Sequence, residues 1–224
     1  MTCLAVIPAR AGSTRIPGKN LRSLGGIPLI GWSIQVALDS GLFSDVLVST
    51  DSDEIAEVAE GFGASIPFLR PKALAGENST TAEVMMHLLG SVPPAEKFAL
   101  LQPTSPLRKI QHLSAALDLI DSSQAESLVS IALKRYPVSH LLPCSGLENI
   151  GHPSGHNVTF NGITQSALRL LNGAIYLSTT ERFLRTGTFF DSETVFFEMD
   201  QMSSVDIDDE DDWILAEAVL AARK

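Results

Sequence analysis

The chain is short of cysteine and of basic residues, and each shortage excludes a class of protein. Only 2 of its 224 residues are cysteine, Cys3 and Cys144, so reduced thiols fit better than the disulfide framework of a secreted scaffold. Lysine and arginine number 16 against 26 acidic residues, which gives a formal net charge of -10. Because nucleic acids and anionic membranes select a basic protein face, neither is an expected partner.

Long hydrophobic runs are missing as well. The chain has no stretch of about 18 apolar residues, and its N-terminus lacks the charged start and apolar core of a secretory signal. We therefore expect a cytoplasmic protein that does not enter a membrane. With 224 residues and 45% hydrophobic content, the sequence predicts a single domain over residues 1–224 with one substantial core.

Strand and helix patterns alternate along the first half of the chain. Apolar runs predict strands at 4–7, 45–50, 98–101, 127–132 and 173–178, with a short extended piece at 65–69. Helical patterns and caps predict helices at 29–40, 53–61, 80–89, 110–121 and 209–222. Such alternation is typical of βαβ units, so we expect an α/β fold with a twisted, mostly parallel sheet covered by helices.

The pattern changes at about residue 134. Pro, Gly, Ser, His and Asn follow one another without clear periodicity to about 164, and a long irregular stretch inside a domain usually serves function or an interface. Residues 189–199 alternate enough to predict a strand pair or an arm. We interpret the region of about 135–200 as including a small inserted lobe. His152 and His156 lie in it without a helix to align them, so they are interpreted as a loop feature and not a zinc site.

A basic loop follows the first predicted strand. Arg10, Arg15 and Lys19 come shortly after the apolar run 4–7, and Gly12 is expected to allow the positive φ that turns backbone N–H groups toward an anion. Open α/β sheets bind ligands beyond the carboxyl ends of their strands. The loop therefore predicts a cradle for a triphosphate, although it matches neither the dinucleotide-binding nor the Walker glycine pattern. An ordinary basic surface turn is the alternative.

Two carboxylates near the end of the chain complement this loop. Asp206 and Asp208 lie in an apparently extended segment, so both are expected on one side while Ile207 points to the core. Mg²⁺ prefers one or two carboxylates together with phosphate oxygens and waters. The pair therefore predicts a magnesium site opposite the basic loop. The alternative is an acidic helix start favoured by the helix dipole, which is how we interpret the acidic residues at 209–212.

Five segments of the chain form a specific set when taken in order. They are the basic loop Ile7-Pro8-Ala9-Arg10-Ala11-Gly12-Ser13-Thr14-Arg15-Ile16-Pro17-Gly18-Lys19-Asn20; Ser49-Thr50-Asp51; Arg70-Pro71; Leu101-Gln102-Pro103-Thr104-Ser105-Pro106-Leu107-Arg108; and Asn172-Gly173-Ala174-Ile175-Tyr176 before Ser204-Val205-Asp206-Ile207-Asp208. Together they resemble the acylneuraminate cytidylyltransferases, also called CMP-sialic acid synthetases. The resemblance covers nearly the whole chain. It implies a Rossmann-like, homodimeric, Mg²⁺-dependent nucleotidyltransferase that converts CTP and a nine-carbon α-keto sugar acid into a CMP-sugar and pyrophosphate.

The resemblance also implies a role for each residue of the site. The implied nucleotide-binding residues are Arg10, Gly12, Ser13, Arg15, Lys19, Asn20, Arg70, Ser79 and Thr81. Arg10, Lys19 and Asp208 would carry catalysis, since displacement at a phosphate needs charge neutralisation and positioning. Ser79 is equally a candidate helix N-cap. The sugar would be bound by Gln102, Tyr176, Phe189 and Phe190, with the aromatic residues of the arm supplied by a partner subunit. Arg108 is interpreted as a surface residue flanking a helix, with pairing to a sugar carboxylate as the alternative.

Two departures from the family pattern blur the choice of sugar. Thr14 stands where many relatives carry lysine, and the resulting Gly-Ser-Thr-Arg version is similar to that of enzymes for the eight-carbon sugar Kdo. The arginine that holds the substrate carboxylate in relatives is missing before Asn172, where Arg169, Lys134 and Arg135 are candidate replacements. The substrate could be a variant nonulosonate, of legionaminic type or deaminated. A Kdo-type enzyme and a non-catalytic CTP-binding homologue are the alternatives.

Overall fold

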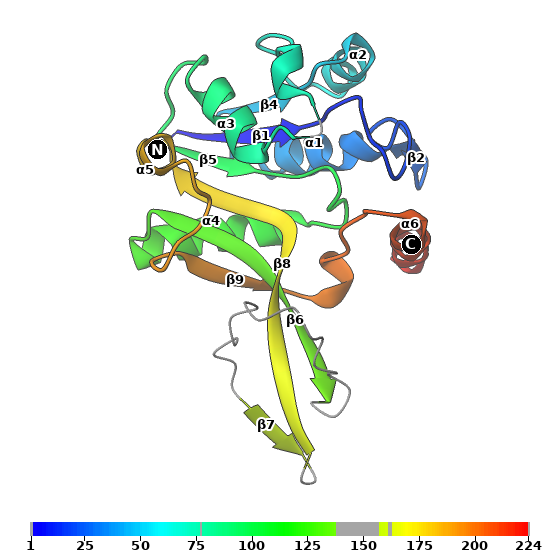
Figure 1. Ribbon diagram of the computed structural model, residues 1–224, viewed down its shortest axis with the longest axis vertical. Coiled ribbons are helices and arrows are strands. Elements are labelled where there is room, and N and C mark those ends of the chain that lie inside the picture. The colour runs from blue at the N-terminus through cyan, green and yellow to red at the C-terminus, as the bar shows by residue number, and fades with distance from the viewer. Residues whose placement is uncertain (1, 77, 138–156, 161–162, 224) are drawn as a thin grey trace.

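One twisted sheet forms the centre of the molecule (Figure 1). The computed structural model describes residues 2–76, 78–137, 157–160 and 163–223, with side chains outside 133–169. The strand order is β4 (Asp45–Ser49), β1 (Cys3–Pro8), β5 (Lys97–Leu100), β8 (Ile163–Thr179), β6 (Ser127–Pro137) and β9 (Val195–Met199). β8 is antiparallel to both of its neighbours, and the remaining pairs in this order are parallel. The expected α/β, Rossmann-like fold with a mostly parallel sheet is confirmed.

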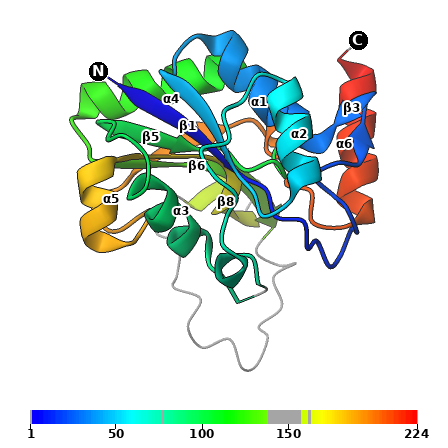
Figure 2. The same ribbon diagram turned by 90° about the horizontal axis from the view of Figure 1, so that it is seen from above.

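Helices cover both faces of this sheet (Figure 2). On one face lie α1 (Leu29–Ser40), α2 (Asp53–Gly61) and α4 (Ile110–Ser123), which share a buried hydrophobic cluster with the strands. On the other face lie α3 (Thr81–Leu89) and α5 (Thr180–Thr186), within a second cluster. α6 (Glu210–Ala222) packs on a third cluster that includes the short strand β2 (Ser23–Leu24), the partner of β3 (Ile27–Pro28). Of the helices in the described part of the chain, none is long and apolar enough to cross a bilayer.

β1 and the part of β5 from Phe98 onward are apolar because each face of these strands meets a different helical layer. In β1, Ala5 and Ile7 belong to the first cluster, whereas Leu4 and Val6 belong to the second. Phe98 and the residues after it divide between the two clusters in the same alternating way. A strand buried on both faces favours apolar side chains at successive positions. The polar residues that follow each strand are therefore collected at the edge where β1 and β5 end.

β6 and β8 continue past the sheet and, with β7 (Asn157–Phe160), form an antiparallel extension (Figure 1). The boundaries expected at 127–132 and 173–178 are therefore too short, because β6 reaches Pro137 and β8 begins at Ile163. Pairing between the two strands outweighs the weak strand propensity of these residues. Cys144, His152 and His156 lie outside the described residues. The interpretation of residues 135–200 as including a dimerisation and sugar-binding lobe stays a prediction.

Two expected extended segments pair over fewer residues than predicted. Of residues 65–69, only Ser65 forms a bridge, to Leu47, and Pro67 has no backbone N–H with which to continue a ladder. Residues 189–199 form neither a strand pair nor an arm: the strand is limited to Val195–Met199 and pairs with β6 at the sheet edge. The Asp191 carboxylate accepts the backbone N–H of Glu193 (2.9 Å), and such a turn ends extended structure.

The N-cap of α3 is Thr80, and the alternative that Ser79 caps it is wrong. Thr80 Oγ1 accepts the backbone N–H of Glu83 at 3.2 Å, and the Glu83 carboxylate accepts the backbone N–H of Thr80 at 2.8 Å, which completes a capping box. Ser79 Oγ instead donates to the Ala73 carbonyl at 3.1 Å. The cap holds the start of α3, where Ser79 and Thr81 stand.

Replacing Thr80 by alanine removes one half of this box. Thr80→Ala should lower the free energy of unfolding by about 1 kcal/mol, the usual value of an N-cap. The measurement is the urea denaturation midpoint at constant slope. Thr80→Ser keeps the hydroxyl acceptor and serves as the control, and equal loss in both variants would contradict the capping role.

Candidate functional site

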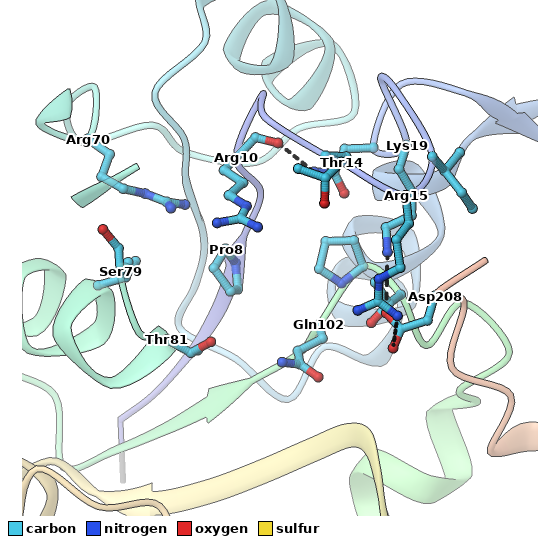
Figure 3. Close-up of a pocket in the computed structure, with 16 residues that line it drawn as sticks. Pro8, Arg10, Thr14, Arg15, Lys19, Arg70, Ser79, Thr81, Gln102 and Asp208 are labelled. Atoms are coloured by element: carbon cyan, nitrogen blue, oxygen red, sulfur yellow. Dashed lines mark hydrogen bonds and ion pairs between the residues drawn. The ribbon is translucent and has the colours of Figure 1, made fainter. Parts of the chain in front are cut away.

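A cleft of about 410 Å³ opens where β1 and β5 end. Its lining consists of Pro8, Arg10, Ser13, Thr14, Arg15, Ile16, Lys19, Asn20, Arg70, Ser79, Thr81, Val84, Gln102, Pro103, Thr104 and Asp208. Figure 3 shows two ends to this cleft: Arg70, Ser79 and Thr81 at one, and Arg15, Lys19 and Asp208 at the other, with Arg10 between them. The structure therefore brings most of the predicted nucleotide-binding residues together.

Hydrogen bonds at its base hold the basic loop. The Asn20 amide donates to the Arg10 carbonyl at 3.0 Å, and the backbone N–H of Ala11 donates to Asp51 Oδ1 at 3.0 Å. Arg10 Nη1 donates to the Gly76 carbonyl at 3.0 Å, which joins the loop to the segment before α3. Asn20 is 7% exposed, so it supports the loop as well as lining the cleft.

The conformational reason given for Gly12 is wrong. Gly12 does not have a positive φ, and a Cβ added there would meet nothing within 4 Å. The left-handed residue of the loop is Gly18, with a φ of 63°, whose carbonyl accepts the backbone N–H of Leu21. The left-handed turn of the loop thus comes after Arg10 and Arg15 and directly before Lys19. Gly12 is not among the lining residues, and its contact with a nucleotide stays a prediction.

Hydrophobic packing sets the cations opposite Asp208. Ile16 and Ile207 are 1% and 0% exposed and lie in one cluster with the buried Trp213 of α6. Their neighbours in sequence are consequently held at the surface of that cluster, facing each other. Arg15 Nη1 lies 3.0 Å from Asp208 Oδ2, and Lys19 Nζ lies 3.7 Å from Asp208 Oδ1. The expectation that Ile207 points to the core is confirmed.

Lys19 is a largely buried cation, whereas Arg15 is an exposed one. Lys19 Nζ donates to the Ile207 carbonyl at 2.7 Å, and its side chain is only 14% exposed. Burial lowers the pKa of Lys19, while Asp208 and Asp206 raise it. The Arg15 side chain is 65% exposed, so its ion pair with Asp208 is screened by water.

Asp206 lies behind the cleft and not in its lining. Its Oδ1 atom is buried and has no hydrogen-bond partner, and burial raises the pKa of the carboxyl. The Thr104 hydroxyl and Lys19 act against this rise. A buried carboxylate oxygen without a donor is one that a cation would satisfy. The residues at 209–212 are a helix start, since Asp209 caps α6 through the backbone N–H groups of Asp211 and Asp212.

The donor set suits Mg²⁺ better than zinc. No group of three or more His, Cys, Asp or Glu side chains gathers anywhere in the described part of the chain. Asp206 and Asp208 offer two carboxylates from one segment, next to a basic loop that can hold phosphate oxygens. This is the arrangement in which Mg²⁺ completes its coordination with substrate and water.

The opposite end of the cleft depends on Arg70. Its guanidinium is buried, with Nε donating to Ser49 Oγ at 3.1 Å and Nη2 donating to the Ser49 carbonyl. Burial lowers the pKa of Arg70, and Asp51 raises it. Sequence reasoning gave Ser49-Thr50-Asp51 no role of its own. Its position directly after a buried strand was the available signal, because Ser49 fixes Arg70 and Asp51 fixes the basic loop.

Arg108 is buried, so its interpretation as a surface residue is wrong. It is 4% exposed, and its guanidinium donates to the Ala174 carbonyl (2.6 Å), the Gln102 carbonyl (3.0 Å) and Ser33 Oγ (3.2 Å). Burial lowers the pKa of Arg108, although arginine stays charged at neutral pH. The two prolines between Gln102 and Arg108 keep the segment out of a helix, so it turns back toward β8.

The predicted sugar-binding residues divide into two groups. Gln102 lines the cleft, whereas Tyr176 and Phe189 pack in the second hydrophobic cluster with their ring centroids 5.3 Å apart. Phe190 is 48% exposed, so one phenylalanine points inward and the other outward, as expected. Among the described residues of this one chain, the three aromatic side chains do not line the cleft. The pairs Arg169–Leu133, Lys134–Leu168 and Arg135–Ala167 place the candidate replacement cations on the β6–β8 extension.

The fold and the cleft together define a class of protein, the α/β nucleotide-binding transferases with a basic loop after the first strand. A family model described as cytidylyltransferase matches residues 4–160, and the chain belongs to the cytidylyltransferase family. It is 37% identical to CMP-N,N'-diacetyllegionaminic acid synthase of Legionella pneumophila, over 98% of this chain and 97% of that protein. It is 34% identical to N-acylneuraminate cytidylyltransferase of Escherichia coli over 95% of this chain, but spans only 51% of that relative.

Solved structures extend the likeness of fold. CMP:2-keto-3-deoxy-manno-octonic acid synthetase, solved in complex with CTP, superimposes with a TM-score of 0.73 over 100% of both chains at 16% identity. 4-Diphosphocytidyl-2C-methyl-D-erythritol synthase from Anaerococcus prevotii gives 0.66 over 98% of this chain and 96% of that chain, at 11% identity. At such low sequence identities, these two structures show a similarity of fold alone.

Lys19→Ala should weaken CTP binding by roughly 10- to 100-fold, because a hydrogen bond to a charged group contributes about 1.5–3 kcal/mol. Calorimetric titration with CTP in the presence of Mg²⁺ is the measurement. Arg185→Ala removes a cation that pairs with Glu126 and Glu181 outside the cleft lining, and it controls for the change in net charge. Unchanged CTP affinity in Lys19→Ala would remove the cradle interpretation.

Proposed function

We propose that this chain is a CMP-nonulosonate synthetase, which transfers CMP from CTP to a nine-carbon, sialic-type α-keto sugar acid and releases pyrophosphate. The observation that carries the proposal is the cleft itself: a basic loop faces Asp208 at the carboxyl ends of parallel strands in a cytidylyltransferase. Similarity to a CMP-N,N'-diacetyllegionaminic acid synthase over nearly the full length of both chains supports a nonulosonate as the sugar.

The reaction exchanges one phosphorus–oxygen bond for another. The anomeric hydroxyl oxygen of the sugar attacks the α-phosphorus of CTP, and the bond to the oxygen that bridges the α- and β-phosphates breaks. Pyrophosphate leaves with that bridging oxygen, and the hydroxyl proton passes to solvent or a base. Negative charge grows on the departing phosphates, so catalysis depends on fixed cations beside them. Arg10 and Lys19 meet that need, since hydrogen bonds hold each of them in place.

We propose Asp206 and Asp208 as the ligands of Mg²⁺. When bound, Mg²⁺ would neutralise phosphate charge and orient the triphosphate. The unpartnered, buried Oδ1 of Asp206 supports this role, as does the position of Asp208 in the cleft lining. Asp208 is therefore the proposed acidic catalytic residue. It would act by positioning the phosphates.

The nucleoside would occupy the end of the cleft around Arg70, Ser79 and Thr81. Arg70 is held rigidly by Ser49, and the capped start of α3 fixes the other two side chains. Asn20, Ser13 and Gly12 would contact the ribose and the phosphates from the basic loop. With this order, the α-phosphate would lie near Arg10, which stands between the two ends of the cleft (Figure 3).

The sugar would enter beside Gln102, and we propose that a second copy of the chain contributes to its pocket. Tyr176, Phe189 and Phe190 are the proposed aromatic residues. Exposed apolar side chains on β8, β9 and the turn before β9 support a homodimer interface; they are Leu170, Leu171, Phe190 and Phe196. A single monomeric species in analytical ultracentrifugation at micromolar concentration would contradict the dimer. The proposed location is the cytoplasm, where CTP is available.

A pyrophosphate-release assay with CTP and a panel of α-keto sugar acids tests the proposed function. We expect turnover with nonulosonic acids, either N-acetylneuraminic acid or an acid of the legionaminic type, and little with Kdo. Turnover with Kdo alone would establish the Kdo-type alternative. Binding of CTP without turnover against every acid would establish a non-catalytic homologue.

Asp208→Asn should lower kcat by about 100-fold or more while CTP still binds weakly, because the variant keeps the shape of the side chain and loses its charge. Steady-state rates at several Mg²⁺ concentrations are the measurement. Asp211→Asn is the matched control, since it removes the same charge from an exposed position on the first turn of α6. Near-normal Mg²⁺-dependent rates in Asp208→Asn would contradict the metal assignment.

A further inference from the structure

β8 turns a corner at residues 172–175 inside the sheet. On either side of it, Tyr176 pairs with Val129 and Leu171 with Ile131, so Ser130 of β6 stands opposite all four corner residues. Gly173 in this corner has a φ of 69°, a conformation that residues with a Cβ rarely adopt. The corner interrupts the ladder where β8 passes the cleft, and such irregularities often serve a site.

The backbone of Gly173 touches two side chains of the proposed site. A Cβ at this position would lie 2.6 Å from Gln102 Oε1 and 3.2 Å from Asp206 Oδ2, with Ser105 Oγ also at 3.2 Å. Gln102 is the proposed sugar ligand, and Asp206 is a proposed metal ligand. The two side chains come from different segments and meet over one glycine, so its bare Cα sets how closely they approach.

Asn172 fastens this corner to three other parts of the chain. It is 3% exposed, and its Oδ1 accepts from Ser130 Oγ (2.6 Å) and from the backbone N–H of Ala174 (3.2 Å). The side-chain amide of Asn172 donates to Ser204 Oγ at 2.9 Å, and its backbone carbonyl accepts from Ser105 Oγ at 3.0 Å. Ser204 precedes Asp206 by two residues, and Ser105 follows Gln102 by three. One asparagine thus bonds to both segments that carry the side chains meeting over Gly173.

Arg108 closes the same arrangement from the opposite side. Its guanidinium donates to the carbonyls of Ala174 and Gln102, so the corner and the Gln102 backbone share one buried cation. We propose that Asn172 and Gly173 are positioning residues that fix Gln102 and Asp206 relative to each other, and thereby couple the sugar subsite to the metal subsite. This inference rests on the proposed function.

Gly173→Ala is the direct test, and Gly187→Ala is its matched control. Gly187 has a φ of 65°, but an added Cβ there would meet nothing within 4 Å. Both substitutions impose similar backbone strain, and only Gly173→Ala drives an atom between Gln102 and Asp206. Both variants should lose thermal stability through that strain, and Gly173→Ala should lose more because its Cβ also overlaps Gln102 Oε1. Only Gly173→Ala should lower kcat/KM for the sugar acid, by about 100-fold, the effect of misplacing a reactive group by roughly 1 Å.

Calorimetric titration with CTP adds a measurement that does not depend on turnover. Its dissociation constant is compared in Mg²⁺ and in EDTA for each variant. Gly173→Ala should keep the metal-free CTP affinity within about twofold and lose roughly tenfold in the gain that Mg²⁺ confers, a typical effect of disturbing the support of a metal ligand. The inference would be overturned if Mg²⁺ raised the CTP affinity of Gly173→Ala as much as that of Gly187→Ala and the KM for the sugar acid were unchanged.

Ser204→Ala tests the same coupling without backbone strain, and decides the matter if Gly173→Ala does not fold. It removes the acceptor of the Asn172 amide, whereas Ser178→Ala removes a buried hydroxyl elsewhere on β8 as the control. Ser204→Ala should reduce the Mg²⁺-dependent gain in CTP affinity by roughly tenfold, and the control should leave it unchanged. Equal values in the two serine variants would overturn the coupling.

The two proposals fail in distinguishable ways. If the wild-type chain releases no pyrophosphate with any acid, the proposed function fails, and the Mg²⁺-dependent gain in CTP affinity still measures the effect of the corner on Asp206. If the wild-type chain turns over and both tested variants match their controls, the positioning role fails and the function stands.

Discussion

The burial of Ile16 and Ile207 against Trp213 is the interaction on which the cleft depends. Each isoleucine is flanked by a charged residue that the cluster cannot accept, so Arg15 and Asp208 are left at its surface, facing each other. Apolar packing is non-directional, yet here it determines a charge arrangement, because the position of each charge in the sequence is fixed relative to an anchored neighbour. α6 contributes to the cleft by supplying Trp213 to this cluster.

The structure could be predicted from the sequence wherever polar and apolar residues follow a regular pattern along a short stretch. The basic loop after the first strand, the inward-pointing Ile207 and the strands buried on both faces could all be predicted, since each follows from local pattern. The left-handed turn was assigned to Gly12 although Gly18 forms it, because a glycine permits such a φ without requiring it. The interpretation of Arg108 is wrong for a different reason: two of its three acceptors, the Ala174 carbonyl and Ser33 Oγ, are distant in sequence, and only the tertiary fold brings them to the guanidinium.

The extension of β6 and β8 shows the same limit of local reasoning. Residues such as Arg135 and Ser166 have weak strand preference, and their strands exist because each is the partner of the other. Conversely, the alternation in 189–199 looked like an extended arm, but a turn centred on Asp191 ends the pattern before Val195. The relation of Gln102 to Asp206 through Gly173 was likewise hidden, because nothing in the sequence marks a glycine that two other segments approach.

Asp208 competes with any entering anion for the two cations of the cleft, because it already pairs with both of them. Arg15 and Lys19 already face a carboxylate, so an entering polyanion exchanges places with Asp208 and leaves it without counterions. A divalent cation arriving at the same time relieves that carboxylate, whereas a small anion or a cation arriving by itself upsets the local balance. At the proposed nucleotide and metal sites, joint uptake of both would therefore be favoured over the uptake of either one alone, and by linkage each would raise the affinity for the other.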